Sequence, residues 1–198
     1  MEGGLQTILN GGNVSGTLIS GGEQRVSSGG SAVDTTIEEG LQTVLNGGNV
    51  SGTHISGGEQ NISSGGSAVD TTIEEGLQTV LNGGNVSGTH ISGGEQNISS
   101  GGSAVDTTIE EGLQTVLNGG NVSGTHISGG EQNISSGGSA VDTTIEVGLQ
   151  TVFDGGSVNG TINHGGEQHI SSGGSAINTT LDGYLDSFQW WQRNRHHN

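Results

Sequence analysis

Three histidines recur at a fixed spacing in the middle of the chain, and histidine is the side chain most used for metal binding and proton transfer near neutral pH. His54, His90 and His126 are each 36 residues apart. In a chain wound into coils of about 18 residues, neighbours in this set would lie two coils, about 9.6 Å, apart on one outer surface. Two imidazoles at that distance cannot bind the same Zn²⁺ ion. We therefore expect an outward ladder of histidines alternating with threonines; the alternative is a stripe of titrating imidazoles.

Carboxylates are the second set of groups that could do chemistry. Asp34, Glu38 and Glu39 recur 36 residues later as Asp70, Glu74 and Glu75. Such groups could bind Ca²⁺, but the GGxGxDxUx nonapeptide of calcium-binding rolls is absent. Catalysis would need acids and bases that converge in a cleft, and no inserted loops are present to wall one. The sequence predicts a solvated acidic face, with no catalytic residue, bound metal, cofactor or enzymatic activity.

The composition limits the classes of partner. Lys and Arg number 3 against 20 Asp and Glu, which gives a formal charge of 3 − 20 = −17, and Arg25 is the only Lys or Arg before the C-terminal tail. Nucleic acids and anionic membranes both reward clustered Lys and Arg, so neither partner is expected. The chain has no cysteine and no apolar run long enough to span a membrane. We also expect no export signal within it, because its first residues lack a charged segment followed by an apolar one.

An internal repeat must position these groups. The segment LQTVLNGG recurs at Leu41, Leu77 and Leu113, which fixes a period of 36 residues. Each unit divides into two related halves of equal length, for example LQTVLNGGNVSGTHISGG and EQNISSGGSAVDTTIEEG. Ten such coils start at residues 5, 23, 41, 59, 77, 95, 113, 131, 149 and 167. The chain contains 42 glycines and no proline, so it can turn sharply and keep every backbone N–H available for sheet hydrogen bonds.

The coil positions that should point inward combine apolar and polar residues. The fourth position is always Val or Ile, and the fifteenth is Ile or Leu in nine coils. Strand alternation places the glutamine of the second position and the threonine of the thirteenth on the same inner side. Each glutamine amide can then donate to its copy about 4.8 Å away. The predicted internal ladder includes Gln42, Gln60, Gln78, Gln96, Thr53, Thr71, Thr89 and Thr107. We expect valines of the tenth and eleventh positions, such as Val50 and Val69, to share core volume between neighbouring coils.

Glycines divide each coil into three short strands. The pair at the seventh and eighth positions, the glycines near the end of the coil and the twelfth position each predict a corner. The predicted fold is all-β, a right-handed parallel β-helix (β-solenoid) of ten 18-residue coils, about 48 Å long. We assign residues 1–184 to the β-solenoid repeat domain and residues 185–198 to a C-terminal cap or tail.

Two places should depart from the regular pattern. Asn163 stands where the ninth coil should carry isoleucine, which predicts a local bulge or register shift. At the C-terminal end, bulky aromatic side chains would cover an open core and unpaired backbone groups. The residues of this predicted aromatic cap are Tyr184, Phe188, Trp190 and Trp191.

With its unit written as xQxVxxGGxAxxTxIxxG, the chain resembles the passenger repeat of self-associating autotransporters, the antigen 43 and diffuse-adherence adhesin family. The resemblance covers residues 3 to about 184. It implies an extracellular adhesin on the bacterial cell surface that self-associates through its side faces, aggregates cells into biofilms and contacts host cells. It also implies, for some members, a glycosyltransferase partner that adds heptose to serines. The candidate acceptors are Ser63, Ser64, Ser99, Ser100, Ser135 and Ser136.

Two other function classes fit a regular solenoid. A structural rod, natural or designed, would need no partner, and the identity of residues 41–76 with residues 77–112 is compatible with it. An ice-binding solenoid would need a regular outward array of threonines. The threonines found in every coil are expected inside, and the outward third and fourteenth positions are mixed. Ice binding is therefore the minor alternative.

Overall fold

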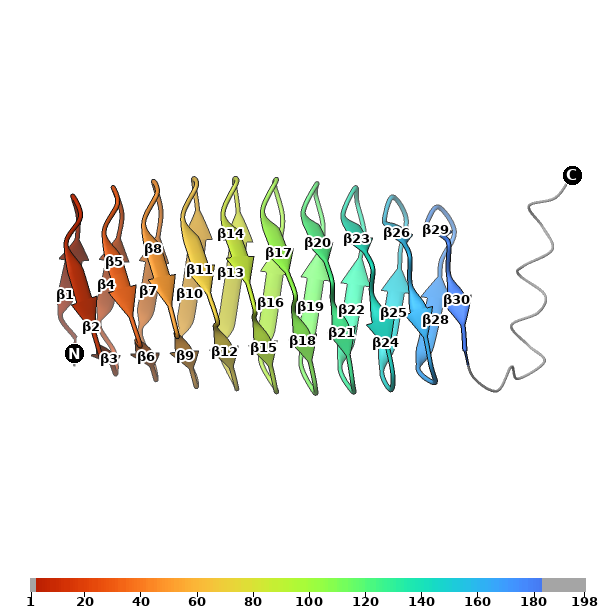
Figure 1. Ribbon diagram of the computed structural model, residues 1–198, viewed down its shortest axis with the longest axis horizontal. Helices are drawn as coiled ribbons and strands as arrows, with labels where there is room; N and C mark the ends of the chain where they lie inside the picture. Colours follow the sequence, from red (N-terminus) through yellow and green to blue (C-terminus); the bar gives the residue numbers. More distant parts are fainter. Residues whose placement is uncertain (1–2, 183–198) are drawn as a thin grey trace, which may run out of the picture.

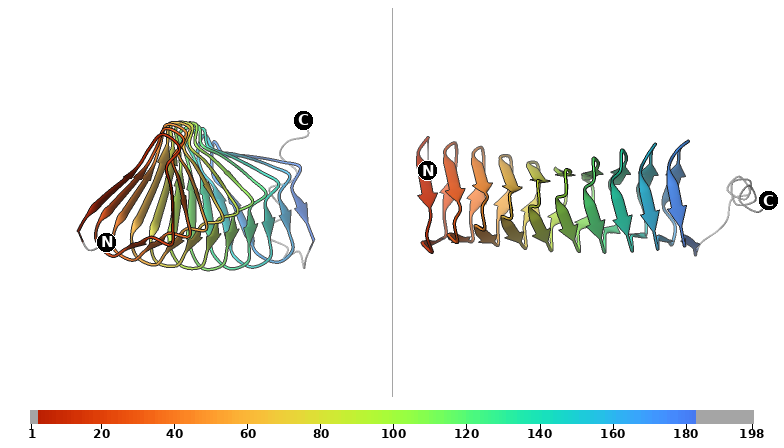
Figure 2. Two further views of the ribbon diagram at one scale, coloured as in Figure 1. Left: turned by 60° about the vertical axis from the view of Figure 1, so that its left-hand side comes forward. Right: turned by 90° about the horizontal axis from the view of Figure 1, so that it is seen from above.

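The computed structural model describes residues 3–182, which form thirty short β-strands. Three strands make one coil, and the coils follow one another along the long axis of a narrow rod (Figure 1). Two further views show the same stack of coils from other directions (Figure 2). This part of the chain contains no helix with the length and apolar character needed to cross a membrane.

Strands at equivalent places in successive coils form three parallel ten-stranded sheets. The first sheet contains β1 (Leu5–Ile8), β4 (Glu23–Val26), β7 (Leu41–Val44), β10 (Glu59–Ser63), β13 (Leu77–Leu81), β16 (Glu95–Ile98), β19 (Leu113–Val116), β22 (Glu131–Ile134), β25 (Leu149–Val152) and β28 (Glu167–Ile170). The second sheet contains β2 (Asn13–Ser15), β5 (Ser31–Val33), β8 (Asn49–Ser51), β11 (Ser67–Val69), β14 (Asn85–Ser87), β17 (Ser103–Val105), β20 (Asn121–Ser123), β23 (Ser139–Val141), β26 (Ser157–Asn159) and β29 (Ser175–Ile177). The third sheet contains β3 (Leu18–Ile19), β6 (Thr36–Ile37), β9 (His54–Ile55), β12 (Thr72–Ile73), β15 (His90–Ile91), β18 (Thr108–Ile109), β21 (His126–Ile127), β24 (Thr144–Ile145), β27 (Ile162–Asn163) and β30 (Thr180–Leu181).

Each strand pairs in register with its counterpart one coil away. Gln60 of β10 is opposite Gln42 of β7 on one side and Gln78 of β13 on the other. Every coil position therefore forms a column along the rod. The predicted fold class, a β-solenoid of ten coils with three strands in each, is confirmed.

The corner between the first and second strands of a coil is a tight turn. In the fifth coil, Asn82 and Gly83 have φ angles of 50° and 76°, and Gly84 N donates to Leu81 O at 3.0 Å. Two consecutive positive φ angles inside such a hydrogen bond define a type I′ turn, for which Asn-Gly is the preferred pair. In the following coil Ser100 and Gly101 adopt the same conformation. These turns place the sixth-position side chain at the tip of a corner.

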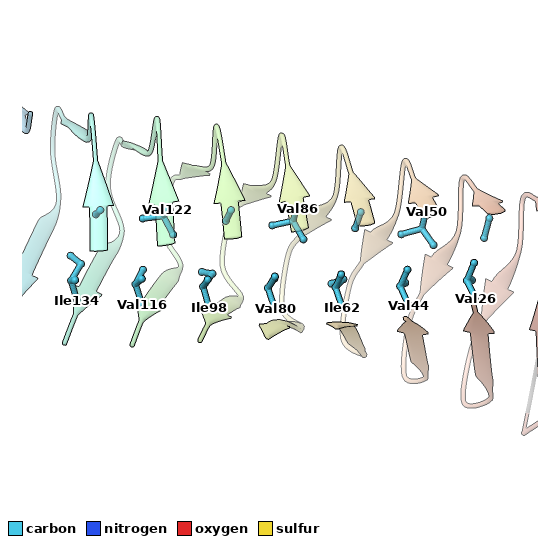
Figure 3. Packing of buried hydrophobic residues seen from close by; sticks show 14 of the residues in the cluster. Val26, Val44, Val50, Ile62, Val80, Val86, Ile98, Val116, Val122 and Ile134 are labelled. Atoms are coloured by element: carbon cyan, nitrogen blue, oxygen red, sulfur yellow. The ribbon is translucent and has the colours of Figure 1, made fainter. Parts of the chain in front are cut away.

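The apolar interior consists of two separate clusters. In one, the fourth-position residues of the first sheet face the tenth-position residues of the second sheet, as Val80 faces Val86 (Figure 3). The other is the fifteenth-position isoleucine column of the third sheet, which includes Ile91. Buried glutamines and threonines, most of them hydrogen-bonded to one another, supply most of the remaining interior.

The expectation that both valine positions share core volume is wrong. Tenth-position Val50 is 3% exposed, whereas eleventh-position Val69 is 39% exposed. The alternation of the short second-sheet strands points one position inward and the next outward. Inside, valine alternates with alanine at the tenth position, as Val50 with Ala68, without compensation from the eleventh.

The predicted bulge or register shift at Asn163 is also wrong. Asn163 of β27 pairs with Ile145 of β24 and Leu181 of β30 in the ordinary register. Its side chain is buried, donates from Nδ2 to Gly166 O at 2.9 Å, and accepts at Oδ1 from Gly165 N at 3.1 Å. Backbone groups of the adjacent corner thus form hydrogen bonds with the buried side-chain amide, and the strand keeps the regular register.

The predicted aromatic cap formed by Tyr184, Phe188, Trp190 and Trp191 lies outside the described residues, as does the proposed boundary between residues 184 and 185.

Candidate interaction surfaces on the side faces

The glutamine and threonine columns form the internal framework beneath the side faces. Gln42, Gln60, Gln78 and Gln96 are fully buried, and Thr53, Thr71, Thr89 and Thr107 are 1% exposed. Gln78 Nε2 donates to Gln60 Oε1 at 2.7 Å, and its own Oε1 accepts from Gln96 Nε2 at 2.6 Å. Thr89 Oγ1 donates to the same Gln78 oxygen at 3.4 Å, whereas Thr71 Oγ1 has no such partner. These columns support the rod and present nothing to a ligand.

The three histidines lie on the outer side of the third sheet, with side chains 39–40% exposed. Each imidazole Nε2 lies close to a carboxylate of the next coil. The distances are 3.6 Å from His54 to Glu74, 3.6 Å from His90 to Glu110, and 3.7 Å from His126 to Glu146. We call these three the His–Glu pairs.

Sequence reasoning compared the histidines with one another and missed their carboxylate partners. Each partner lies one coil plus two positions further along the chain, so that position fourteen of one coil meets position sixteen of the next. This offset is the signal that could have revealed the pairs, because positions fourteen and sixteen both point outward.

Other charged contacts are isolated. Near the C-terminal end of the described rod, His164 Nδ1 lies 3.6 Å from Asp182, and His169 Nε2 lies 3.1 Å from Glu167. Near the other end, the hydrogen bond to Glu23 and the negative charge of that carboxylate raise the pKa of Arg25. Arg25–Glu23 and His169–Glu167 join the same two coil positions, the third and the first, but they lie in the second and tenth coils and form no continuous row.

The surface of the described rod carries shallow, open hollows. One lies at a corner and is lined by glycines with Glu95, Glu111 and Glu131. Another lies on the first sheet beside Leu9, Leu41 and Arg25. Within residues 3–182, no group of three or more His, Asp or Glu side chains is placed to hold one metal ion. The arrangement suits surface contacts along the rod better than chemistry in a cleft.

On each side face, the outward residues of one coil position form a stripe along the rod, and the residue type in the stripe alternates between odd and even coils. On the first sheet, the outward first position is leucine in odd coils and glutamate in even coils, as in Leu77 and Glu95. On the second sheet, outward Val69 alternates with Ser87. On the third, outward Thr72 alternates with His90. The same pattern thus recurs every two coils, about 9.6 Å.

The candidate acceptor serines occupy two different environments. Ser64, Ser100 and Ser136 are exposed at the tips of type I′ corners, with φ near 50°. Their neighbours Ser63, Ser99 and Ser135 are only partly exposed.

Comparison with solved structures reveals a related chain. A TibC-catalysed, hyper-glycosylated fragment of TibA, an autotransporter adhesin passenger, is 36% identical in sequence, with a TM-score of 0.70. The alignment covers 92% of this chain and 79% of the TibA fragment. The Streptococcus pneumoniae surface protein and adhesin PfbA aligns over 90% of this chain and 77% of its own, at 9% identity and a TM-score of 0.42. That likeness carries no weight in the assignment.

No protein-family model matches the chain, and no curated protein matches it. The identity to TibA extends along nearly the whole rod, and the repeat unit carries the glutamine, paired-glycine, threonine and isoleucine positions of the passenger repeat. The chain therefore belongs to the family of autotransporter adhesin passengers of the antigen 43 and TibA type.

Proposed function

We propose that the chain is a non-enzymatic adhesin-like rod at the bacterial cell surface that associates with other copies of itself through its side faces and so aggregates cells. The observation that carries this proposal is the two-coil repetition of the outward residues, for example the alternation of Leu77 with Glu95 that continues through all ten coils of the first sheet. Two copies laid side by side can make the same contact several times. Contacts repeated on a rigid support act together, so individually weak ones can give a stable complex.

The acidic surface sets the conditions for this association. The formal charge of −17 makes two copies repel one another at low ionic strength. Salt at about 0.15 M shortens the screening length to about 8 Å, which weakens that repulsion. Association should therefore increase when salt is added to a dilute buffer.

Sedimentation velocity over a wide range of protein and salt concentration tests the proposal, together with sedimentation of cells that display the rod. We expect concentration-dependent oligomers and clumping of the displaying cells. A monomer at every concentration, together with no clumping, would favour the alternative of a structural rod without a partner.

The ice-binding alternative receives no support from the threonine column. The threonines of the thirteenth position, such as Thr53 and Thr89, are buried and cannot contact an ice surface. The outward fourteenth position alternates Thr72 with His90 and does not form a uniform array. An assay of ice recrystallisation is expected to show no inhibition.

We also propose that a glycosyltransferase modifies the exposed corner serines, since TibA was hyper-glycosylated by TibC. Ser64, Ser100 and Ser136 are the preferred acceptors, because an enzyme can reach an exposed corner more easily than a partly covered strand end. Co-expression with such an enzyme and peptide mass spectrometry should find sugar on these residues. Sugar confined to Ser63, Ser99 and Ser135 would contradict the assignment.

A further inference from the structure

We propose that the three His–Glu pairs are half-sites for Zn²⁺ and that zinc held by them joins two copies of the rod through their third sheets. This inference rests on the proposed self-association and specifies one face and one ligand for it. The half-sites are His54 with Glu74, His90 with Glu110, and His126 with Glu146.

The separation of the two groups in each pair fits two ligands of one zinc ion. Tetrahedral Zn²⁺ binds nitrogen and oxygen at about 2.0–2.2 Å, which places two ligand atoms about 3.4 Å apart. The observed separations are 3.6, 3.6 and 3.7 Å. They exceed the usual hydrogen-bond range of about 2.7–3.2 Å, so the imidazole and carboxylate are adjacent without a direct hydrogen bond. A small shift of either exposed side chain would let an ion enter between them.

The chemistry of the pair selects a transition metal. Imidazole and carboxylate are common zinc ligands, whereas Ca²⁺ prefers six to eight oxygen ligands. Each half-site supplies two ligands, and the described part of one chain offers no third at any of these places. A second copy of the same surface can supply the other two.

The arrangement of the half-sites suits a symmetric pair of rods. They lie in a line on the third sheet, two coils or about 9.6 Å apart. In an antiparallel pair, the half-site of His54 faces that of His126 in the other copy, and the half-site of His90 faces its own counterpart. A two-fold contact of this kind uses the same surface patch on both copies. Three sites with two histidines and two glutamates each would form together.

Charge and accessibility favour this face. The His–Glu pairs are half-exposed, with glutamate side chains 52–56% exposed, and they alternate with the smaller Thr72 and Ser92. Exposed Glu75 and Glu111 lie beside them and add negative charge. A bound divalent cation would reduce the repulsion between two acidic rods. Three bridges in register would bind more tightly than one two-ligand half-site alone.

Sedimentation velocity of the full chain with ZnCl₂, CaCl₂ or EDTA tests the inference. The test variant H54Q/H90Q/H126Q removes the imidazoles, and E74Q/E110Q/E146Q removes the carboxylates. H164Q/H169Q is the matched control, because it removes histidines that also neighbour acids but lie outside the line. His196 and His197 are retained in all variants, so any zinc that they bind is common to them.

We expect zinc to dimerise the wild type and the control, EDTA to reverse this, and calcium to have no comparable effect. Both triple variants should need at least about tenfold more protein for the same dimer fraction. Circular dichroism should show the same strand content in every variant, because the substituted side chains point outward.

Two results would overturn the zinc inference: equal dimerisation by calcium, or zinc-dependent dimers that persist in both triple variants. Self-association that is the same in zinc and in EDTA would also overturn it, while leaving the proposed function intact. The absence of any association, with or without zinc, would overturn both.

Discussion

The inside and the outside of the rod follow different rules. Inside, a column keeps nearly the same residue in every coil, as glutamine does at the second position and threonine at the thirteenth. Outside, residues alternate, as Leu77 with Glu95 and Thr72 with His90. The buried glutamine and threonine columns thus repeat with every coil, whereas the outer columns, like the buried valine–alanine column of the tenth position, repeat with every second coil.

Stacking at about 4.8 Å explains both rules. An amide carries a donor and an acceptor, so identical glutamines satisfy one another along the column. Identical carboxylates stacked at that distance would repel, so acids occupy alternate coils. The twelfth position adds a steric reason, because a Cβ on Gly88 would come within 2.6 Å of Asp70 Oδ1. Glycine fits beside the acid without displacing that carboxylate, and it also adopts the φ of 64° at Gly88 without strain.

Breaking one member of the glutamine column should have the largest effect on stability. Gln96→Ala removes the donor to Gln78 Oε1 at 2.6 Å, and it removes the acceptor of both Gln114 Nε2 and Thr107 Oγ1, at 2.7 and 3.5 Å. Each buried unsatisfied group costs about 1–3 kcal/mol, so we expect a loss of about 3–5 kcal/mol in urea unfolding. The neighbouring outward change Asn97→Ala should cost less than about 0.5 kcal/mol. Equal losses of unfolding free energy in the two variants would show that the buried glutamine column stabilises the rod no more than the outward side chains do.

The corner glycines offer a second test. A Cβ on Gly102 would collide with the Val80 carbonyl of the preceding coil, whereas Gly101 has open space around it and a φ of 76°. We expect Gly102→Ala to lower the unfolding free energy by about 3 kcal/mol, through forced separation of the coils. Gly101→Ala should cost about 1–2 kcal/mol from backbone strain alone. Thermal unfolding monitored by circular dichroism measures both, and the reverse order would contradict the packing explanation.

Asn163 allows the regular interior to be restored. Asn163→Ile would continue the column between Ile145 and Leu181. We expect a gain of about 1 kcal/mol, because the added apolar burial is partly offset by the lost bonds to Gly165 and Gly166. Urea unfolding measures the change. A loss of stability would mean that the corner depends on the asparagine more than the column depends on isoleucine.

The smallest effect is expected from the outward valines. Val105→Ser should change stability by less than about 0.5 kcal/mol, because Val105 is 37% exposed on the second sheet. Its inward neighbour Ala104 is fully buried, and Ala104→Ser should cost about 1–3 kcal/mol for a buried hydroxyl without a partner. Similar costs at the two sites, measured by urea unfolding, would argue against the alternation of this strand.

Most of the fold could be predicted from the sequence because the same inward, outward and corner positions recur in each of the ten coils. The spacing of Gln60 and Gln78 fixes the coil length, and the columns of valine, isoleucine and threonine fix which side faces inward. In a stack of similar coils, each coil contacts only its neighbours, and these have the same turn and strand preferences. Contacts between residues distant in sequence therefore seldom override the local conformation.

Only the tertiary structure decided the details that depend on side-chain reach between coils. It placed Val69 outside, kept Asn163 in register through hydrogen bonds to its own corner, and brought His54 within 3.6 Å of Glu74. These outcomes depend on the orientation of each short strand and on how far a side chain extends across the gap between coils. The linear pattern specifies which residues share a column, but the distances between neighbouring columns arise only when the coils are stacked.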